Sequence, residues 1–272
     1  METRELDTVL FERCGAVGLI RLNRPQRMNA VIEQMYLDLD TLLDEAEADA
    51  DLRALVLTGS VRQGPDGPKP AFCAGADLKA HAAGERSPWQ KRAYIQLAHR
   101  SSYRLYRFAK PVIAAINGPA RGAGFEMALN CDFILMADTA SLAMTETGLG
   151  TFIGGGATAH LPRLVGLQQA KRLVYLGEVL DGPAAVAAGL ALASHPLQRL
   201  EAEALALAER LAERAPVSLQ LAKDLLQRSA ERDLHTVLLA ETEAILACMT
   251  TADWQEGLDA FAEKRRPSFQ GR

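Results

Sequence analysis

Two glutamates stand among small and apolar residues, where a globular chain rarely places a carboxylate. Glu126 lies within residues 122–129 (GAGFEMAL), and Glu146 lies within residues 143–150 (AMTETGLG). A carboxyl that is buried without partners has a raised pKa, and it can then act as an acid or a base near neutral pH. A single glutamate is more often exposed on the polar side of an amphipathic element. Two of them, each beside a glycine-rich turn, favour a catalytic pair instead.

Two short glycine-containing segments are the second feature that could take part in chemistry. They are Ala74-Gly75-Ala76 and Gly122-Ala123-Gly124. Glycine allows a ligand to approach the backbone closely, and the first N–H groups of a helix have no partner within the helix. Tight turns without any ligand explain both segments equally well at this point.

The composition limits the classes of function. The chain has 272 residues, 49% of them hydrophobic and 24% charged, with a formal net charge of -4. This is an ordinary globular composition with enough apolar residues for a large core, and the negative charge argues against nucleic acid as a partner. The N-terminus lacks a basic start followed by an apolar run, and no stretch reaches about 18 apolar residues. We therefore expect a cytoplasmic protein that has no membrane partner.

The thiols and imidazoles give no sign of a metal centre. The four cysteines and five histidines are dispersed along the chain, without a Cys-x-x-Cys pair. No Gly-x-Ser-x-Gly or P-loop pattern occurs either. We expect reduced structural cysteines, no metal and no tightly bound cofactor. A dinucleotide-binding enzyme is a further alternative because of Gly148-Leu149-Gly150, but Ile153 occupies the place of the third glycine.

The pattern of apolar residues predicts an α/β architecture. Strands are expected at 17–22, 53–58, 70–74, 111–116 and 133–137, and helices at 32–49, 88–109 and 122–130. Loops are expected at 64–70 and 81–88, where proline, glycine and polar residues gather. From about residue 199 the pattern is helical only, with helices expected at 199–214, from Pro216, at 231–249 and at 252–264. The sequence thus predicts a core over 1–198 and a helical region over 199–272.

Three segments, taken in order, resemble the enoyl-CoA hydratase/isomerase (crotonase) superfamily. They are residues 72–79 (FCAGADLK), 110–132 (KPVIAAING and the glycine segment after it), and 145–156 (TETGLGTFIGGG). The similarity continues in 22–25 (LNRP) and in the tail 253–267, so it spans nearly the whole chain. It implies a spiral of repeated ββα units followed by helices, and subunits assembled as a homotrimer or as a hexamer of two trimers.

The resemblance also implies the roles of the two glutamates and of the two glycine segments. The substrate would be an acyl-CoA thioester, with coenzyme A carried as part of that substrate. The backbone N–H groups of Ala76 and Ala123 would hold the thioester oxygen as negative charge develops on it. Glu126 and Glu146 would hold a water molecule, with Glu126 activating it and Glu146 protonating the α-carbon. Two neighbouring carboxyls titrate as a coupled pair.

The same resemblance implies a set of residues that bind the substrate. They come from the turn after Asn23-Arg24-Pro25, from the two glycine segments and from the C-terminal tail, where two of them would reach across from a neighbouring subunit. These residues are Arg27, Met28, Ala74, Ala76, Asp77, Leu78, Lys79, Gly122, Gly154, Phe261 and Lys264. The lysines are equally explained as part of a solvated charged face.

Three residues depart from the pattern of the hydratases. Ala123 stands at the centre of what is usually a glycine triplet, Phe125 is bulkier than usual, and Ile153 replaces a common proline. We expect Ala123 to narrow the pocket and Phe125 to reshape the acyl site. Hydration of a 2-enoyl-CoA is the leading hypothesis, and isomerisation of the double bond is a competitor that needs chiefly one carboxylate. Hydrolase, lyase or decarboxylase activity, and a non-catalytic binding role, stay open because a fold does not fix a reaction.

Overall fold

The main sheet has seven strands. The computed structural model describes residues 2–82 and 86–272. The strands run in the order β1-β2-β3-β4-β5-β7-β10. Their bounds are β1 Thr3–Glu5, β2 Val9–Cys14, β3 Val17–Leu22, β4 Ala54–Gly59, β5 Val112–Ile116, β7 Phe133–Ala137 and β10 Ala193–His195. The first three strands pair antiparallel, and the pairs from β3 to β10 are parallel. Every residue of β4 and β5 is buried, as expected for parallel strands that are covered on both faces.

A second, small sheet lies beside the first. It has the order β6-β8-β9, with β6 Pro119–Arg121, β8 Ser141–Ala143 and β9 Leu180–Asp181. Together with the helices, the two sheets confirm the predicted α/β fold class. The predicted strand at 70–74 is wrong, because this segment contributes only one isolated bridge, between Cys73 and Ala120. Its backbone is held by a side chain instead, since Asn29 Nδ2 donates to the Ala71 carbonyl at 2.8 Å.

The predicted helices lie close to their expected positions. Their bounds are α1 Glu33–Ala48, α2 Leu78–Ala82, α3 Pro88–Arg107, α4 Ala123–Leu129, α5 Ala157–Val165, α6 Leu167–Tyr175, α7 Gly182–Ala187, α8 Leu197–Ala212, α9 Pro216–Arg228, α10 Leu234–Met249 and α11 Ala252–Glu263, with short 3-10 turns η1 Pro25–Arg27, η2 Thr147–Leu149 and η3 Ser229–Glu231. Helices α2, α5, α6 and α7 were not predicted. A capping box of Ser87 and Gln90 fixes the start of α3. In the predicted loop at 81–88, residues 81–82 instead end α2, and residues 83–85 lie outside the described part of the chain.

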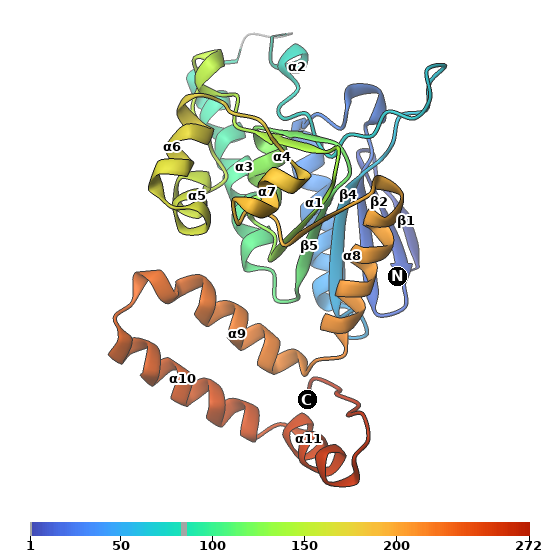
Figure 1. The fold of residues 1–272 in the computed structure, drawn as a ribbon, viewed down its shortest axis with the longest axis vertical. Helices are drawn as coiled ribbons and strands as arrows, with labels where there is room; N and C mark the ends of the chain where they lie inside the picture. The colour runs from blue at the N-terminus through green and yellow to red at the C-terminus, as the bar shows by residue number, and fades with distance from the viewer. Residues whose placement is uncertain (1, 83–85) are drawn as a thin grey trace.

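The C-terminal helices differ in their relation to the core. Helix α8 packs across strands β3, β4, β5, β7 and β10, whereas α9, α10 and α11 extend away below the sheet (Figure 1). The predicted boundary near residue 199 falls inside α8. Within the described residues, no helix is both long enough and apolar enough to cross a membrane.

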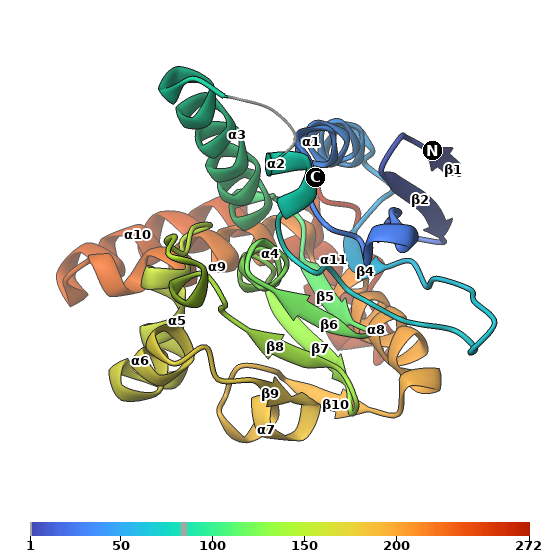
Figure 2. The same cartoon turned by 90° about the horizontal axis from the view of Figure 1, so that it is seen from above.

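Helix α4 occupies the middle of the molecule when it is seen from above (Figure 2). It contacts α3 on one side, α5 on another, and β6 at its start. A short helix in this position can place side chains between the two sheets and α3. This is where the candidate site is built.

Candidate active site

Helix α4 carries Glu126 one turn after Ala123. Residues three apart lie on the same face of a helix, so the Ala123 backbone and the Glu126 side chain border the same space. The opposite face is apolar, and Phe125, Ala128 and Leu129 are buried in the core. The amphipathic pattern around Glu126 therefore has a simple cause. The apolar neighbours anchor the helix in the core, and the carboxylate lies on the other face of the helix.

A glycine-rich loop holds the Glu126 carboxylate in place. Gly154 N–H donates to Glu126 Oε1 at 2.5 Å. Asn130 ties this loop to the helix, because its Nδ2 donates to both the Glu126 and the Gly155 carbonyls. Burial raises the pKa of Glu126 to about 7, the Gly154 N–H opposes the shift, and the charge of Glu146 adds to it. Glu126 is thus a carboxyl poised to exchange a proton near neutral pH.

Glu146 is buried, with 8% of its surface exposed. Its carboxylate lies beside Gly122, at the N-terminal end of α4. Burial raises the pKa of Glu146, which the N–H groups of Glu146 itself and Thr145 partly offset. Its Oε2 is buried, and within residues 2–82 and 86–272 no hydrogen-bond partner reaches it. A buried oxygen of this kind is available to a ligand or to a bound water. The fold therefore brings together two carboxyls that are 20 residues apart, and it gives both a raised pKa.

The two glycine segments meet next to this pair. A β-carbon on Gly75 would come within 2.8 Å of the Arg121 carbonyl and 3.9 Å of Ala123 N, so the segments at 74–76 and 121–123 lie in contact. Among the backbone and side-chain hydrogen bonds of the described residues, none uses the N–H of Ala76 or of Ala123. Two adjacent free N–H groups of this kind can bind a developing oxyanion.

Gly122→Ala is expected to damage the site severely, because Gly122 has φ 45° and a β-carbon there would collide with Glu146 Oε1. We expect a rate of the catalysed reaction about 10²-fold lower, since small displacements of catalytic groups have effects of that size. Gly148→Ala is the matched control, since its β-carbon would meet nothing within 4 Å and its φ is ordinary. Turnover rates and unfolding midpoints of both variants test this. Equal activity of the two variants would show that Glu146 does not depend on Gly122.

The predicted residues at 27–28 and 74–79 lie side by side. Ala74 N–H donates to the Met28 carbonyl at 3.0 Å, and Val31 pairs with Gly75 and Asp77 through its own N–H and carbonyl. Met28 has φ 51°, and its side chain is 45% exposed. Leu78 and Lys79 are exposed on α2, and Arg27 is exposed on η1. The turn at 27–28 and the segment at 74–79, which carries Ala76, are therefore neighbours in the fold.

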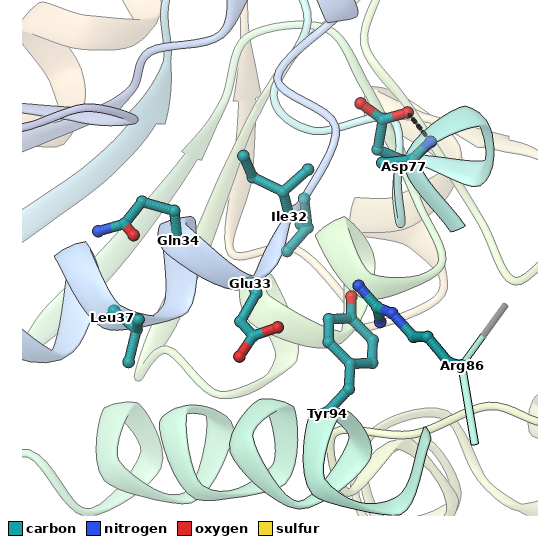
Figure 3. Close-up of a pocket in the computed structure, with 9 residues that line it drawn as sticks. Ile32, Glu33, Gln34, Leu37, Asp77, Arg86 and Tyr94 are labelled. Atoms are coloured by element: carbon teal, nitrogen blue, oxygen red, sulfur yellow. Dashed lines mark hydrogen bonds between the residues drawn. The ribbon is translucent and has the colours of Figure 1, made fainter. Parts of the chain in front are cut away.

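The Asp77 side chain already has internal partners. Its carboxylate binds Arg24 Nη2 at 3.0 Å and accepts the Ala80 N–H at 3.2 Å. The Ala80 N–H and Arg24 lower the pKa of Asp77. Figure 3 shows this carboxylate turned toward the backbone of α2. Asp77 thus fixes the loop that presents Ala76, and its side chain is not free to bind a substrate.

Phe261 and Lys264 do not join the site within one chain. Both lie at the end of α11, at the opposite end of the molecule from α2 (Figure 1). Phe261 is 87% exposed, and Lys264 caps the helix with φ 55°. Any contact between these residues and the site requires a second subunit.

The three departures from the hydratase pattern differ in their consequences. Phe125 is fully buried in the core, with 0% exposed, so any effect on the shape of the acyl site would act through packing. Ile153 is 5% exposed and also packs inward. Ala123 is partly buried, and it borders a cavity of about 20 Å³ beside Glu126. The predicted narrowing of the pocket therefore applies to Ala123. The cavity beside this residue has room for only about one water molecule.

Three side chains near the site were not predicted from the sequence. Tyr36 borders the small cavity with Glu126, and Tyr94 lines a pocket of about 350 Å³ together with Glu33 and Arg86 (Figure 3). The Arg86 guanidinium lies 5.0 Å above the Tyr94 ring. The His99 imidazole on α3 and the Glu126 carboxylate both lie close to Gly154, where a β-carbon would come within 3.1 Å of His99 Nε2 and 3.3 Å of Glu126 Oε2. Helical spacing predicts that these residues lie on α1 and α3, but only the packing of those helices shows which ones approach α4.

No group of three or more His, Cys, Asp or Glu side chains in the described part of the chain is arranged to hold a metal ion. All four cysteines are free thiols. The polar groups that converge on the site are the two carboxyls and the two backbone N–H groups. This set is suited to moving protons and to stabilising an oxyanion.

The chain is similar to known proteins over nearly its whole length. Residues 12–272 match the family model described as "Enoyl-CoA hydratase/isomerase". The short-chain-enoyl-CoA hydratase of Clostridium acetobutylicum is 34% identical over 96% of this chain and 97% of its own. The 2,3-dehydroadipyl-CoA hydratase of Escherichia coli is 35% identical over 98% of this chain and 100% of its own. The crystal structure of an enoyl-CoA hydratase from Bacillus anthracis, 36% identical, superposes with a TM-score of 0.91 and covers 98% of this chain and 100% of that one.

Proposed function

Because this chain belongs to the enoyl-CoA hydratase/isomerase family, we propose that it is an enoyl-CoA hydratase. In this proposal it adds water across the double bond of a 2-enoyl-CoA to give a 3-hydroxyacyl-CoA. The family implies an acyl-CoA substrate, and the named hydratases among the relatives support the reaction.

The proposed reaction assigns a role to each group of the site. A water molecule held between the two carboxyls loses a proton to Glu126, and its oxygen bonds to the β-carbon. The electron pair of the double bond moves onto the thioester oxygen, where the N–H groups of Ala76 and Ala123 stabilise it. The electron pair then moves back from the thioester oxygen to the α-carbon, which takes a proton from Glu146. One proton is gained and one lost by the carboxyls, so the pair is reset by proton exchange with solvent.

One observation carries this proposal above the others. Both carboxyls are present beside the two free N–H groups, both have a raised pKa, and Glu126 is held by Gly154. Hydration needs both an acid and a base at once, whereas moving a double bond needs chiefly one proton carrier. The test is turnover of crotonyl-CoA, followed by the loss of absorbance of the enoyl thioester. A 3-enoyl-CoA that is converted while crotonyl-CoA is not would support an isomerase instead.

The pH dependence should report the raised pKa of Glu126. A base must be deprotonated to work, and burial raises the pKa of Glu126 to about 7. The reaction also needs Glu146 to be protonated while Glu126 is deprotonated, so we expect kcat/KM for crotonyl-CoA to pass through a maximum as the pH changes. One limb of this profile should lie near pH 7, instead of near the value of 4.5 of an ordinary glutamate. Because the pair is coupled, the measured value belongs to both carboxyls. A profile that is flat from about pH 5 to pH 8 would contradict this role for Glu126.

We also propose that the subunits assemble as a homotrimer or as two stacked trimers. Helices α9 and α10 expose apolar side chains that need cover, and α10 buries none of its residues within one chain. The exposed apolar residues of these two helices are Leu226, Leu234, Leu238, Leu239, Ile245, Leu246 and Met249. Light scattering from the purified protein measures the assembly. A monomer in solution would overturn this proposal.

In such an assembly Lys264 would reach the coenzyme A of a neighbouring subunit. Lys264→Met is then expected to raise KM about tenfold with little change in kcat, since a lysine–phosphate contact of this kind contributes equally before and during the reaction. Arg266→Met is the control, because the Arg266 side chain is 93% exposed on the same tail. Steady-state kinetics with crotonyl-CoA tests this. The same KM for both variants would remove Lys264 from the binding site.

A further inference from the structure

The small cavity beside Glu126 lies where α1, α3 and α4 meet. It has a volume of about 20 Å³, which is room for about one water molecule. Cavities that stay dry are lined by apolar groups, whereas this wall also carries a carboxyl and several hydroxyls. The polar residues of the wall are Glu126, Tyr36, Ser101 and Ser102, and the rest of it is apolar. The cavity is therefore suited to a single buried water.

Ser101 can offer an oxygen to such a water. This residue is buried, with 5% of its surface exposed. Burial raises the pKa of Asp40 on α1, and a hydrogen bond from the Ser101 hydroxyl opposes this rise. A serine hydroxyl has one hydrogen, so after donating to Asp40 it can only accept a further hydrogen bond. Ser101 is thus an acceptor for a water in the cavity.

Tyr36 can offer the hydrogen that such a water needs. Its side chain is buried, with 6% exposed. Burial raises the pKa of Tyr36, and the neighbouring Tyr94 and Glu126 add to the rise, so the hydroxyl stays protonated. The Tyr36 and Tyr94 hydroxyls are also hydrogen-bonded to each other. Because a hydroxyl can accept while it donates, Tyr36 can accept from Tyr94 and still donate into the cavity.

The Glu126 carboxylate can take a second hydrogen bond. Among the described residues, its hydrogen-bond donor is the Gly154 N–H, at 2.5 Å. A carboxylate has about four acceptor positions, so others are left. A water that accepts the Tyr36 O–H can donate one hydrogen to Glu126 and the other to Ser101. All three partners of this water lie on the wall of the cavity.

We propose that Tyr36 is a positioning residue for the base of the reaction. Its hydroxyl holds one water in this cavity, and that water donates a hydrogen bond to the Glu126 carboxylate. The carboxylate is then fixed by the Gly154 N–H and by the water. A donor to the charged form of a carboxyl favours that form, so the water opposes the effect of burial and keeps Glu126 available as a base. This inference rests on the proposed hydratase function and adds a residue to that site.

Other titratable or charged groups lie on the elements around Glu126. They are Glu146, His99 on α3, His160 on α5, Cys73, and Arg121 on β6. The charge of Glu146 raises the pKa of Glu126. Cys73 is a neutral thiol, because burial raises its pKa to about 12. A replacement of Tyr36 alters none of these groups, so a change in the titration of Glu126 reports on the lost hydroxyl.

Tyr36→Phe removes this hydroxyl and keeps the ring. Tyr175→Phe is the matched control, because Tyr175 is 66% exposed on α6. The pH profile of kcat/KM for crotonyl-CoA is measured for both variants and for the wild type. The ionised form of Glu126 loses a donor in Tyr36→Phe, so the limb expected near pH 7 should move to higher pH. We expect a shift of about 0.5–1 pH unit, the effect of one hydrogen bond, and no shift in Tyr175→Phe.

Two further measurements do not depend on turnover. Infrared spectra follow the protonated carboxyl of Glu126 as the pH changes, with Glu126→Gln to identify its band. The pKa read in this way should be higher in Tyr36→Phe than in the wild type. A high-resolution crystal structure of the wild-type protein should show one ordered water in contact with Tyr36 and Glu126.

The possible outcomes are distinct. An unchanged limb in Tyr36→Phe, a limb that moves to lower pH, or a dry cavity in the wild-type crystal would each overturn the role of Tyr36 and leave the hydratase function intact. No turnover by the wild-type protein would overturn the hydratase function, and the infrared titration would still decide whether Tyr36 acts on Glu126. Unfolding midpoints of both variants within a few degrees of the wild type exclude misfolding as the cause of a shifted limb.

Discussion

Replacing Glu126 with glutamine is expected to lower kcat for crotonyl-CoA by roughly 10²–10⁴-fold, the usual contribution of a positioned acid or base. The amide cannot take a proton from water, but its oxygen can still accept the Gly154 N–H that now holds the carboxylate at 2.5 Å. The side chain should therefore keep its place and lose only its chemistry. Measurement of kcat and KM by loss of enoyl thioester absorbance tests this, and KM should change much less than kcat.

Stability separates this effect from misfolding. The raised pKa of Glu126 means that folding favours its neutral form, so a neutral glutamine should not destabilise the protein at pH 7 or above. An unfolding midpoint equal to or above that of the wild type is expected. Full hydratase activity in Glu126→Gln would exclude Glu126 as the base. If Glu146→Gln were then inactive, the isomerase alternative would gain.

Glu146→Gln is the second replacement with a large expected effect, again roughly 10²–10⁴-fold in kcat. Here the lost group is the acid that protonates the α-carbon. Because both carboxyls act on one water and one substrate, their effects should not add. The double variant, Glu126→Gln with Glu146→Gln, is expected to be about as slow as the slower single variant.

One outcome of the experiment with the double variant would contradict a water shared by the two carboxyls. If the two losses multiplied fully, the carboxyls would be acting in independent steps, and a shared water would no longer describe the site. Assays on a 3-enoyl-CoA with the same variants distinguish the two reactions. An isomerase would lose activity with Glu146→Gln and keep it with Glu126→Gln.

Much of the fold follows from local pattern. Periodicity predicts β3 and β7 at their observed bounds, and it predicts α1 and α3 to within two residues at each end. The strands of the small sheet were not predicted, because two or three residues are too short for any periodicity to show. The segment at 70–74 has the composition of a strand, yet it forms only one isolated bridge, between Cys73 and Ala120 of β6, and Asn29 Nδ2 donates to the Ala71 carbonyl.

Part of the site could also be predicted from the sequence, and the reason is the burial of its carboxyls. Glu126 and Glu146 are conspicuous because their neighbours are apolar, and burial is what raises the pKa of each carboxyl. The sequence cannot show that they meet, since this depends on how α4 packs against β6, α3 and α5. His99 carries no such signal. It is one of several polar residues on a long helix, and only the packing of that helix places its imidazole close to Gly154.

The most direct test of the account is hydration of crotonyl-CoA by the wild-type protein across the pH range. We predict loss of the enoyl thioester absorbance, formation of 3-hydroxybutyryl-CoA, and a rate that passes through a maximum as the pH changes, with one limb near pH 7. Absence of turnover with crotonyl-CoA and with longer 2-enoyl-CoAs would contradict the hydratase function.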